Sequence, residues 1–372
     1  MKIVAIETHH IRVPFTIGAE PTEFVGVRWT ALETLFVRVV TDTGPDGWGE
    51  GFGHACCPAT RAAVETQLGP AALGKNARDI RGVTHQLAQQ VHLFGRSGPL
   101  AYALSALDVA LWDIAGKEAG MPLWRMLGAG SPGRVTAYAS LLRYGAPAAV
   151  AEACLRAVDR GYRHVKLHEV DPQTVGAARK AVGPGIGLML DTNCPWTVDE
   201  AIAIAQRLKE HDLAWLEEPI WPPEDNGALA RVRREGGVPI AAGENADSFH
   251  AFRDMFTTGA VDIAQPSVAK IGGISPMLQI ATLAEAHCVR LVPHCAYFGP
   301  GWLASLHLHI ALSPQAPFER LFIDLEASPY HDRVLAPDGF VTVPDGPGLG
   351  LDPDRDVLAR YRVSKPGVVK ID

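Results

Sequence analysis

The sequence predicts an α/β protein in which a TIM-type barrel follows a mixed α+β unit. From Arg134 onward, short apolar runs of strand-like composition alternate with stretches that suit helices, which is typical of a parallel sheet covered on both faces. Eight such runs occur, which is the number of strands in a TIM barrel. A doubly wound sheet is the alternative. Such a sheet usually carries a GxGxxG turn after its first strand, and the sequence has none in that context.

The segment before the barrel predicts the α+β unit. Thr34–Val40 has the composition of a strand, and the turn signal Asp42–Gly47 follows it. Apolar side chains recur at helical spacing through Pro99–Ala119. The tripeptide Gly120-Met121-Pro122 is then expected to end this helix.

The eight predicted barrel strands are short, and each gap between neighbours has room for a helix. In chain order they are Val135–Ser140, His164–His168, Gly187–Asp191, Leu213–Glu217, Pro239–Glu244, Val261–Ser267, Val289–His294 and Arg320–Leu325.

The composition excludes several classes of protein. Of the 372 residues, 47% are hydrophobic and 20% are charged, which excludes a disordered or collagen-like chain. The formal net charge is −7 and no basic run occurs, so we expect no nucleic acid partner. No apolar stretch approaches the ~20 residues of a membrane helix, so we expect no membrane association. Met1–Phe15 is too polar for a signal peptide.

The cysteines predict a reducing compartment. Six cysteines in a chain of this length are too few for a disulfide scaffold, and none forms a CxxC pair. We therefore expect reduced, mostly buried thiols and a cytoplasmic location.

Polar or ionisable residues end several of the predicted strands. Asp191, Glu217, Glu244, Ser267 and His294 end the third to seventh strands and follow one another at intervals of 23 to 27 residues. This interval is one strand and one helix, so these residues are expected side by side on the C-terminal rim of the barrel. TIM-barrel enzymes hold their active sites on that rim.

Three of these residues are carboxylates on consecutive strands, which predicts a metal site. Without a cation, Asp191, Glu217 and Glu244 would repel one another, and one or more would take up a proton. With a divalent cation they form a cage of hard oxygen donors that suits one Mg²⁺ and leaves positions open for water or substrate. The alternative is that each is a solvated acid at a strand end, or a helix N-cap in the case of Asp191.

Basic residues on the same rim predict proton transfer. Lys166 and His168 share one face of the second strand, and His294 lies across the mouth of the barrel. A substrate carboxylate bound to Mg²⁺ has a more acidic α-proton, so a base can remove it and the metal stabilises the enediolate. A group on the opposite face then returns a proton, which gives epimerisation, or protonates a β-hydroxyl, which gives dehydration.

Two further readings of these side chains stay open. A buried Lys166 paired with a rim carboxylate would have a structural role only. Asn193 lies two positions after Asp191, so in a continuing strand both side chains would point to the same face, and Asn193 is a candidate substrate contact.

Seven segments spread over nearly the whole chain form a specific pattern. They are Gly47–Gly51, Ser105–Gly116, Met121–Gly128, Leu190–Asn193, Trp215–Pro219, Gly243–Asn245 and Lys270–Gly273. In these segments the chain resembles the enolase superfamily, and within it the mandelate racemase/muconate lactonizing enzyme group. The resemblance implies an N-terminal α+β capping domain (residues 1–123) and a modified (β/α)7β barrel with the metal and catalytic residues (124–350). It also implies a C-terminal segment that returns to the cap (351–372), and Asp191, Glu217 and Glu244 as ligands of Mg²⁺.

The chain departs from the family pattern on two strands. The family often has Lys-x-Lys on the second strand with the second lysine as base; here that position is His168, so the base is Lys166, His168 or a relay of both. On the sixth strand, Ser267 stands where the family often has a catalytic Lys or an Asp that pairs with the seventh-strand His. Ser267 is able to orient His294 or to contact substrate, but it cannot raise the basicity of His294 as an anion would. This disfavours a racemase of the mandelate type and a muconate-lactonizing enzyme.

The resemblance also implies an acid on the eighth strand and two substrate-selecting loops in the cap. The acid, which stabilises the enediolate in mandelate racemase, falls on Glu319, with Glu326 as the alternative. The loops fall on about Pro14–Trp29 and Gly51–Arg61. Candidate substrate contacts are Arg28, His54 and Tyr297.

These observations predict a Mg²⁺-dependent lyase or isomerase that removes the α-proton of a small carboxylate substrate. Dehydration of an acid sugar or other hydroxy acid is the leading hypothesis, and racemisation or epimerisation of a hydroxy acid or an amino-acid derivative is the second. A metal-free aldolase with Lys166 as Schiff-base nucleophile and an inactive barrel are further alternatives, and the three carboxylates argue against both. The resemblance also implies a homo-oligomer, from dimer to octamer.

Overall fold

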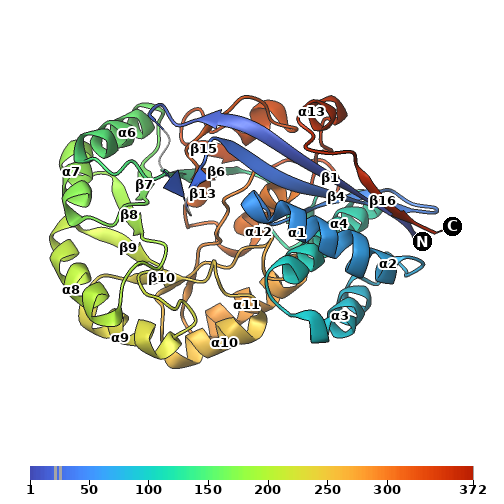
Figure 1. The fold of residues 1–372 in the computed structure, drawn as a ribbon, viewed down its shortest axis with the longest axis horizontal. Helices are drawn as coiled ribbons and strands as arrows, with labels where there is room; N and C mark the ends of the chain where they lie inside the picture. The colour runs from blue at the N-terminus through green and yellow to red at the C-terminus, as the bar shows by residue number, and fades with distance from the viewer. Residues whose placement is uncertain (21–22, 25–26, 372) are drawn as a thin grey trace.

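Parallel strands form the wall of a barrel in the computed structural model, which describes residues 1–20, 23–24 and 27–371. The strands pair in the order β12-β11-β10-β9-β8-β7-β6-β13. Figure 1 shows β7 to β10 following one another along one side of the barrel. Their bounds are β6 Arg134–Ser140, β7 His164–Leu167, β8 Gly187–Asp191, β9 Leu213–Glu217, β10 Ile240–Ala242, β11 Ile263–Ala264, β12 Arg290–Leu291 and β13 Phe318–Leu321. A further short strand, β15 (Phe340–Thr342), pairs antiparallel with β6.

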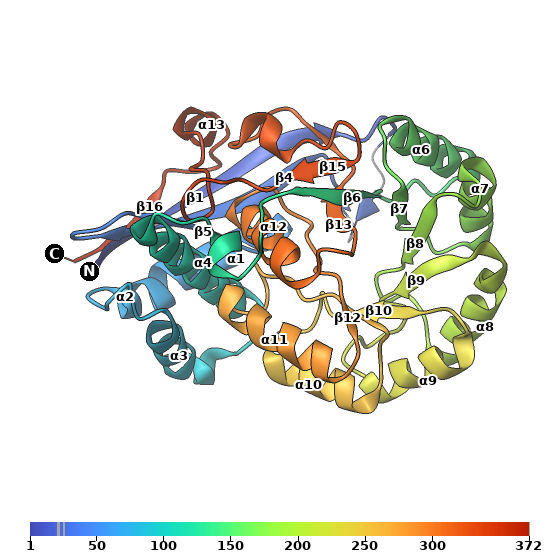
Figure 2. The same cartoon turned by 180° about the vertical axis from the view of Figure 1, so that it is seen from behind.

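A helix follows each strand from β6 to β12, and these helices lie on the outside of the barrel (Figures 1 and 2). They are α6 Pro147–Asp159, α7 Pro172–Val182, α8 Val198–Leu208, α9 Asn226–Gly236, α10 Phe249–Thr258, α11 Ile274–Ala286 and α12 Pro300–Leu312. Side chains that accept from the first turn define several starts, for example Asp171 at α7, Asp225 at α9 and Ser248 at α10. The topology is the predicted modified barrel, (β/α)7β, and this prediction is confirmed.

The predicted position of the eighth strand is wrong. The prediction was Arg320–Leu325, whereas β13 spans Phe318–Leu321 and the next two-residue strand, β14 (Asp324–Leu325), belongs to the cap sheet. Strand-compatible residues run through this segment without a turn signal, so the sequence pattern does not show where one strand ends and the other begins.

The cap is built on an antiparallel sheet of order β14-β1-β4-β5, with β16 also paired to β1. In both views this sheet extends from the barrel toward α1–α4, and the two termini lie together at its far end (Figures 1 and 2). The strands are β1 Ile3–Thr16, β4 Ala31–Thr41, β5 Gly47–Gly51 and β16 Gly367–Lys370, with a small hairpin of β2 Glu23–Phe24 and β3 Val27–Arg28. The helices are α1 Cys57–Ala63, α2 Gly69–Ala72, α3 Ile80–Gln90, α4 Pro99–Ala119 and α5 Leu123–Met126, with α13 Arg355–Arg360 near the C-terminus.

Helix α4 joins the cap to the barrel and has the bounds that its apolar spacing predicts. A Cβ atom at Gly49 of β5 would overlap the backbone carbonyl of Ala106, so glycine lets this strand lie directly against the helix. On its other side, α4 contacts α11, where Trp112 Nε1 donates to Ser275 Oγ over 2.9 Å. The helix is therefore buried along most of its length.

The C-terminal strand β16 pairs with β1, so the chain returns to the cap sheet after the barrel. The predicted domain boundaries after residues 123 and 350 stay predictions. All six cysteines are free thiols. Among the described residues, no helix combines the length and the hydropathy needed to cross a membrane.

Candidate functional site

The C-terminal ends of β8, β9 and β10 bring three carboxylates together. Asp191 and Glu217 are the last residues of β8 and β9, and Glu244 follows β10. One carboxylate oxygen from each residue lies within 4.8 Å of the other two. Asp191 and Glu217 are fully buried, whereas 16% of the Glu244 side chain is exposed. We call these three residues the carboxylate cluster; it opens toward the mouth of the barrel on the side of Glu244.

Neighbouring donors hold the carboxylate cluster in place. The backbone N–H and Nδ2 of Asn193 each lie 3.1 Å from Asp191 Oδ1, and Trp215 Nε1 donates to Glu217 Oε2 over 2.8 Å. The backbone after both strands is strained, since Asn193 has a φ of 54° and Glu218 a φ of 46°. In metal sites, hydrogen bonds from residues that do not themselves bind the metal orient the ligand side chains. Asn193, which the sequence suggested as a substrate contact, holds Asp191 in this structure.

A buried ammonium group lies within the carboxylate cluster. Lys166 Nζ is 3.2 Å from Asp191 Oδ2 and 2.8 Å from both Glu217 Oε1 and Glu319 Oε1, and its side chain is 1% exposed. Burial alone would lower the pKa of Lys166, but the carboxylates raise it well above its usual range. Lys166 is therefore held as a cation.

The pKa values of Glu217 and Asp191 shift in opposite directions. Burial, followed by the charge of Asp191, raises the pKa of Glu217 well above its usual range. Burial also acts to raise the pKa of Asp191, but Lys166 and His168 outweigh it and bring that pKa to about 2. Three carboxylate oxygens with an excess of negative charge are a donor set that fits Mg²⁺.

The two candidate acid/base histidines contact the carboxylate cluster from different sides. His168 Nδ1 donates to the carbonyl oxygen of Leu141, and its Nε2 lies 3.1 Å from Asp191 Oδ2. His294 Nε2 lies 3.0 Å from Glu244 Oε2, and its Nδ1 is buried with no hydrogen-bond partner in the described part of the chain. One imidazole therefore lies beside Asp191 and the other beside Glu244.

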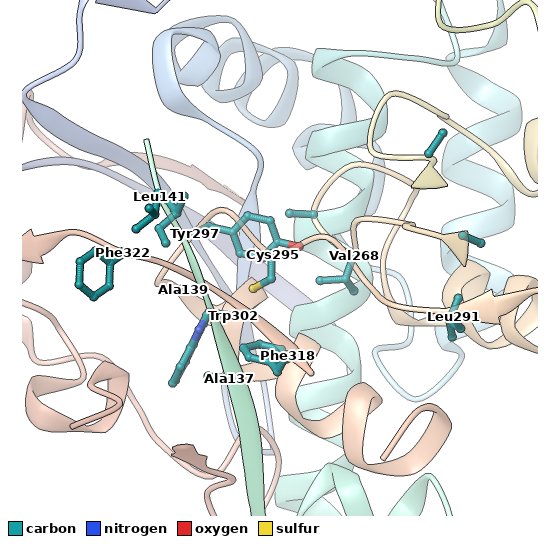
Figure 3. Packing of buried hydrophobic residues seen from close by; sticks show 14 of the residues in the cluster. Ala137, Ala139, Leu141, Val268, Leu291, Cys295, Tyr297, Trp302, Phe318 and Phe322 are labelled. Carbon is teal, nitrogen blue, oxygen red and sulfur yellow. The ribbon is translucent and has the colours of Figure 1, made fainter. Parts of the chain in front are cut away.

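Ser267 contacts Tyr297 rather than the imidazole of His294. Ser267 Oγ lies 3.1 Å from the Tyr297 hydroxyl, which in turn donates to the backbone carbonyl of His294 over 3.2 Å. Tyr297 and Cys295 lie among buried side chains from β6, β13 and α12 (Figure 3). Ser267 is therefore linked to His294 through Tyr297, whose hydroxyl contacts both Ser267 and the backbone carbonyl of His294.

Glu319 lies in the site and its alternative does not. The Glu319 carboxylate accepts from Ser140 Oγ over 2.9 Å and from the Cys295 N–H over 2.8 Å. The second bond joins the loop after β12 to β13. Glu326 is exposed and accepts from the Tyr361 hydroxyl over 2.8 Å.

Of the two candidate substrate contacts in the cap, His54 lies beside the site and Arg28 is exposed. His54 lies 4.8 Å and 5.0 Å, centroid to centroid, from the rings of Trp29 and Phe52. Burial, then the charges of His294 and Lys270, lower its pKa to about 4, so His54 lies beside the site as a neutral side chain. Arg28, in contrast, is exposed and pairs with Glu20 over 3.1 Å.

The two predicted cap loops are shorter than expected. Of Pro14–Trp29, residues 21–22 and 25–26 lie outside the described part of the chain, and β1 continues to Thr16. Most of Gly51–Arg61 is helical: the 3-10 turn His54–Cys56 leads into α1, which begins with Pro58 in its first turn. Proline in the first turn is a helix-start signal that the loop prediction did not use.

Sequence reasoning also missed Lys270. Its side chain is 8% exposed, and Nζ lies 4.8 Å from the centroid of the Phe52 ring. Burial acts to raise the pKa of Glu244, but His294 and then the charge of Lys270 lower it. Lys270 was read only as part of a family segment, although a lysine between apolar residues, six positions after the end of β11, is itself a signal.

A capped (β/α)7β barrel with a carboxylate cluster at its mouth defines a class of enzyme, and the chain belongs to it. The chain is a member of the enolase superfamily. The model described as "Mandelate racemase / muconate lactonizing enzyme, N-terminal domain" matches residues 11–128, and "Enolase C-terminal domain-like" matches residues 149–357.

Three similar proteins illustrate the range of the family. The chain is 34% identical to D-galactarolactone cycloisomerase of Agrobacterium fabrum, over 98% of this chain and 100% of the relative. It is 30% identical to arabinonate dehydratase of Saccharolobus solfataricus, over 89% and 91%. The structure of a racemase from Streptomyces coelicolor A3(2) with bound magnesium has a TM-score of 0.84 and 30% identity, over 97% of this chain and 100% of that one. The chain is therefore a lyase or isomerase of this superfamily, with Mg²⁺ as its cofactor.

Proposed function

We propose that the protein removes the α-proton of an acid sugar and expels the oxygen on its β-carbon, which is a dehydration when that oxygen is a hydroxyl. The observation that supports this proposal is the placement of His168 and His294 on different sides of the carboxylate cluster. Asp191, Glu217 and Glu244 would hold Mg²⁺, which supplies positive charge beside the substrate carboxylate and makes its α-proton more acidic.

His168 is the proposed base. Its Nδ1 is occupied by the Leu141 carbonyl, so Nε2 is the nitrogen that faces the site. Lys166 has the opposite role: three carboxylates hold it as a cation, which suits charge neutralisation at the substrate carboxylate. Glu319 positions Lys166 from the far side.

His294 is the proposed acid. Its Nε2 is the nitrogen at the site, and a proton carried there is able to pass to the departing oxygen. Ser267 supplies no negative charge, and no carboxylate contacts His294 Nδ1 among the described residues. A base of the strength that racemisation needs on this side is therefore not supported. Tyr297 and His54 remain proposed substrate contacts, and Asn193 and Ser267 are proposed to act through Asp191 and Tyr297.

Ring opening is a second candidate reaction. It is favoured by the 34% identity to a D-galactarolactone cycloisomerase across nearly all of both chains. The same two proton transfers would serve, but the departing oxygen would belong to a ring and no water would leave.

The test is proton exchange in D₂O with Mg²⁺ and a panel of sugar acids and their lactones, followed by proton NMR and mass spectrometry. We expect loss of an α-proton signal that EDTA abolishes. A 2-keto product that has lost one water identifies a dehydratase, a 2-keto isomer identifies a cycloisomerase, and an epimer contradicts elimination. Absence of exchange with every member of the panel would contradict the proposed function.

We also propose that the protein is a cytoplasmic homo-oligomer. Six free thiols support a reducing compartment. Leu93 and Phe94 of the cap, which are 80% and 68% exposed, support a contact with another subunit. Light scattering on a sizing column measures the mass, and a monomer would contradict the oligomer.

A further inference from the structure

A cavity of about 460 Å³ lies between the cap and the barrel, next to the carboxylate cluster. Its cap side includes Tyr102 of α4, and its barrel side includes Asn245, Asp247 and Lys270. Asn245 Nδ2 is 3.5 Å from Glu244 Oε1, so the inner end of the cavity adjoins the cluster. A substrate whose carboxylate sits at the cluster therefore has this space available for the rest of its chain.

The ammonium group of Lys270 stands at the wall of this cavity. Only 8% of the residue is exposed, and its cation lies against the Phe52 ring. No hydrogen bond or ion pair joins Nζ to any residue in the described part of the chain. An ammonium has three donors, and those of an ammonium that borders a cavity are free to meet a ligand there. The side chain is therefore set to donate to an oxygen that the protein does not itself provide.

The charges around Lys270 limit the kind of chemical group that this oxygen can belong to. Asp247, Glu224 and the buried Glu218 also line the cavity, so three carboxylates stand against one ammonium. A second carboxylate or a phosphate on the substrate would enter an excess of negative charge. Hydroxyl groups fit better, because they donate to carboxylates and accept from an ammonium at the same time.

We propose that this cavity binds the neutral, hydroxylated end of the substrate, with Lys270 and Asp247 as specificity-determining residues. The enzyme then selects sugar monoacids over the corresponding diacids. This inference rests on the proposed function, because it requires the reacting carboxylate to occupy the metal site.

The test compares pairs of acids that differ only at the last carbon, such as galactonate with galactarate and gluconate with glucarate, in a panel that covers the other hexonates and pentonates. With Mg²⁺, we expect kcat/KM for the reacting monoacid to exceed that for its diacid by at least about tenfold. A preference for the diacid would overturn the subsite and leave the proposed function intact. If no acid in the panel exchanges its α-proton, the proposed function itself fails.

Two substitutions test the named residues. Asp247→Asn removes one negative charge and is expected to reduce the monoacid-to-diacid ratio of kcat/KM by about tenfold. Lys270→Met is expected to raise KM for the monoacid by about tenfold with a smaller change in kcat. Matched controls are Asp159→Asn on α6 and Lys180→Met on α7, both exposed and outside the cavity. Circular dichroism checks folding, and an unchanged ratio in Asp247→Asn would overturn the assignment whether or not Lys270→Met folds.

Discussion

At the scale of single residues, His168 and His294 are expected to have separable roles because they contact different members of the carboxylate cluster. We expect His168→Asn to lower both α-proton exchange and product formation by at least about 10²-fold, since it removes the base. His294→Asn should keep exchange and lose product formation, since only the departing oxygen lacks its proton. Proton NMR in D₂O measures the rate of α-proton exchange and the rate of product formation in one sample.

The control for these variants is His85→Asn, which changes an exposed histidine on α3. If His294→Asn loses exchange as completely as His168→Asn, the two imidazoles act as one unit and the assignment of separate roles is wrong.

Lys166 is predicted to stabilise the fold when no metal is bound. Its ammonium pairs with Asp191, Glu217 and Glu319 in the buried part of the site. Removing one partner of a buried ion pair typically costs about 3–5 kcal/mol. We therefore expect Lys166→Met to reduce the free energy of unfolding in EDTA by about this amount, and Mg²⁺ to restore part of the loss.

Urea unfolding in EDTA and in Mg²⁺ measures both effects, and calorimetry measures Mg²⁺ affinity. The affinity should rise in Lys166→Met, because a competing cation has left the carboxylates. The exposed substitution Lys180→Met serves as the control. Equal stability of Lys166→Met and the native chain in EDTA would show that the ammonium does not balance these charges.

At the scale of elements, Glu50 ties the cap strand β5 to the start of α12. The carboxylate is 2% exposed and accepts from the Gly301 N–H over 2.9 Å. Burial raises the pKa of Glu50 from 4.5 to about 8, although the backbone N–H groups act in the opposite direction. Between these two values the folded protein holds a proton that the unfolded chain releases.

The sign of the pH dependence follows from this difference. The contribution of Glu50 to stability is fully present below about pH 4.5 and is lost as pH rises toward about 8, at no more than about 1.4 kcal/mol per pH unit. Glu50→Gln cannot ionise, so the stability difference between this variant and the native chain should change across that range. Urea unfolding at several pH values measures it, with exposed Glu285→Gln as control. A constant difference from pH 5 to 8 would contradict a buried, protonated Glu50.

The elements also show why some predictions succeed and others fail. Both ends of helix α4 were predicted correctly, because a long stretch of apolar residues at helical spacing ends at Gly120, which has a left-handed φ of 63°. β13 was misplaced because a cap strand follows it within a few residues, and only the pairing of β14 with β1 separates the two.

Among the site residues, Lys270 was missed because its significance lies in Phe52 and the cavity, which come from distant segments. The carboxylate cluster, by contrast, follows from regular spacing, which a parallel barrel turns into proximity.

At the scale of the whole molecule, cap and barrel are joined by buried polar contacts as well as by packing. Asp113 of α4 accepts from the Trp48 N–H of β5 over 2.9 Å and from the Leu349 N–H, which follows the barrel, over 2.8 Å. Lys117 Nζ completes this contact at 2.8 Å from Asp113. Together with Glu50 at α12, these bonds link β5 and α4 of the cap to α12 and to the segment after the barrel.

We therefore predict that Mg²⁺, which the barrel alone would bind, stabilises the cap to the same extent. Ligand at 100 times its dissociation constant adds about 2.7 kcal/mol to the free energy of unfolding. If cap and barrel unfold as one unit, hydrogen exchange in the core of β1 and β4 should slow by the same factor as exchange in β8 and β9. Glu217→Gln, which weakens the metal site, should show little of this effect in either part. Slower exchange in β8 and β9 alone would show that Asp113 and Glu50 do not couple the two parts, and that the cap opens while the metal-bound barrel stays folded.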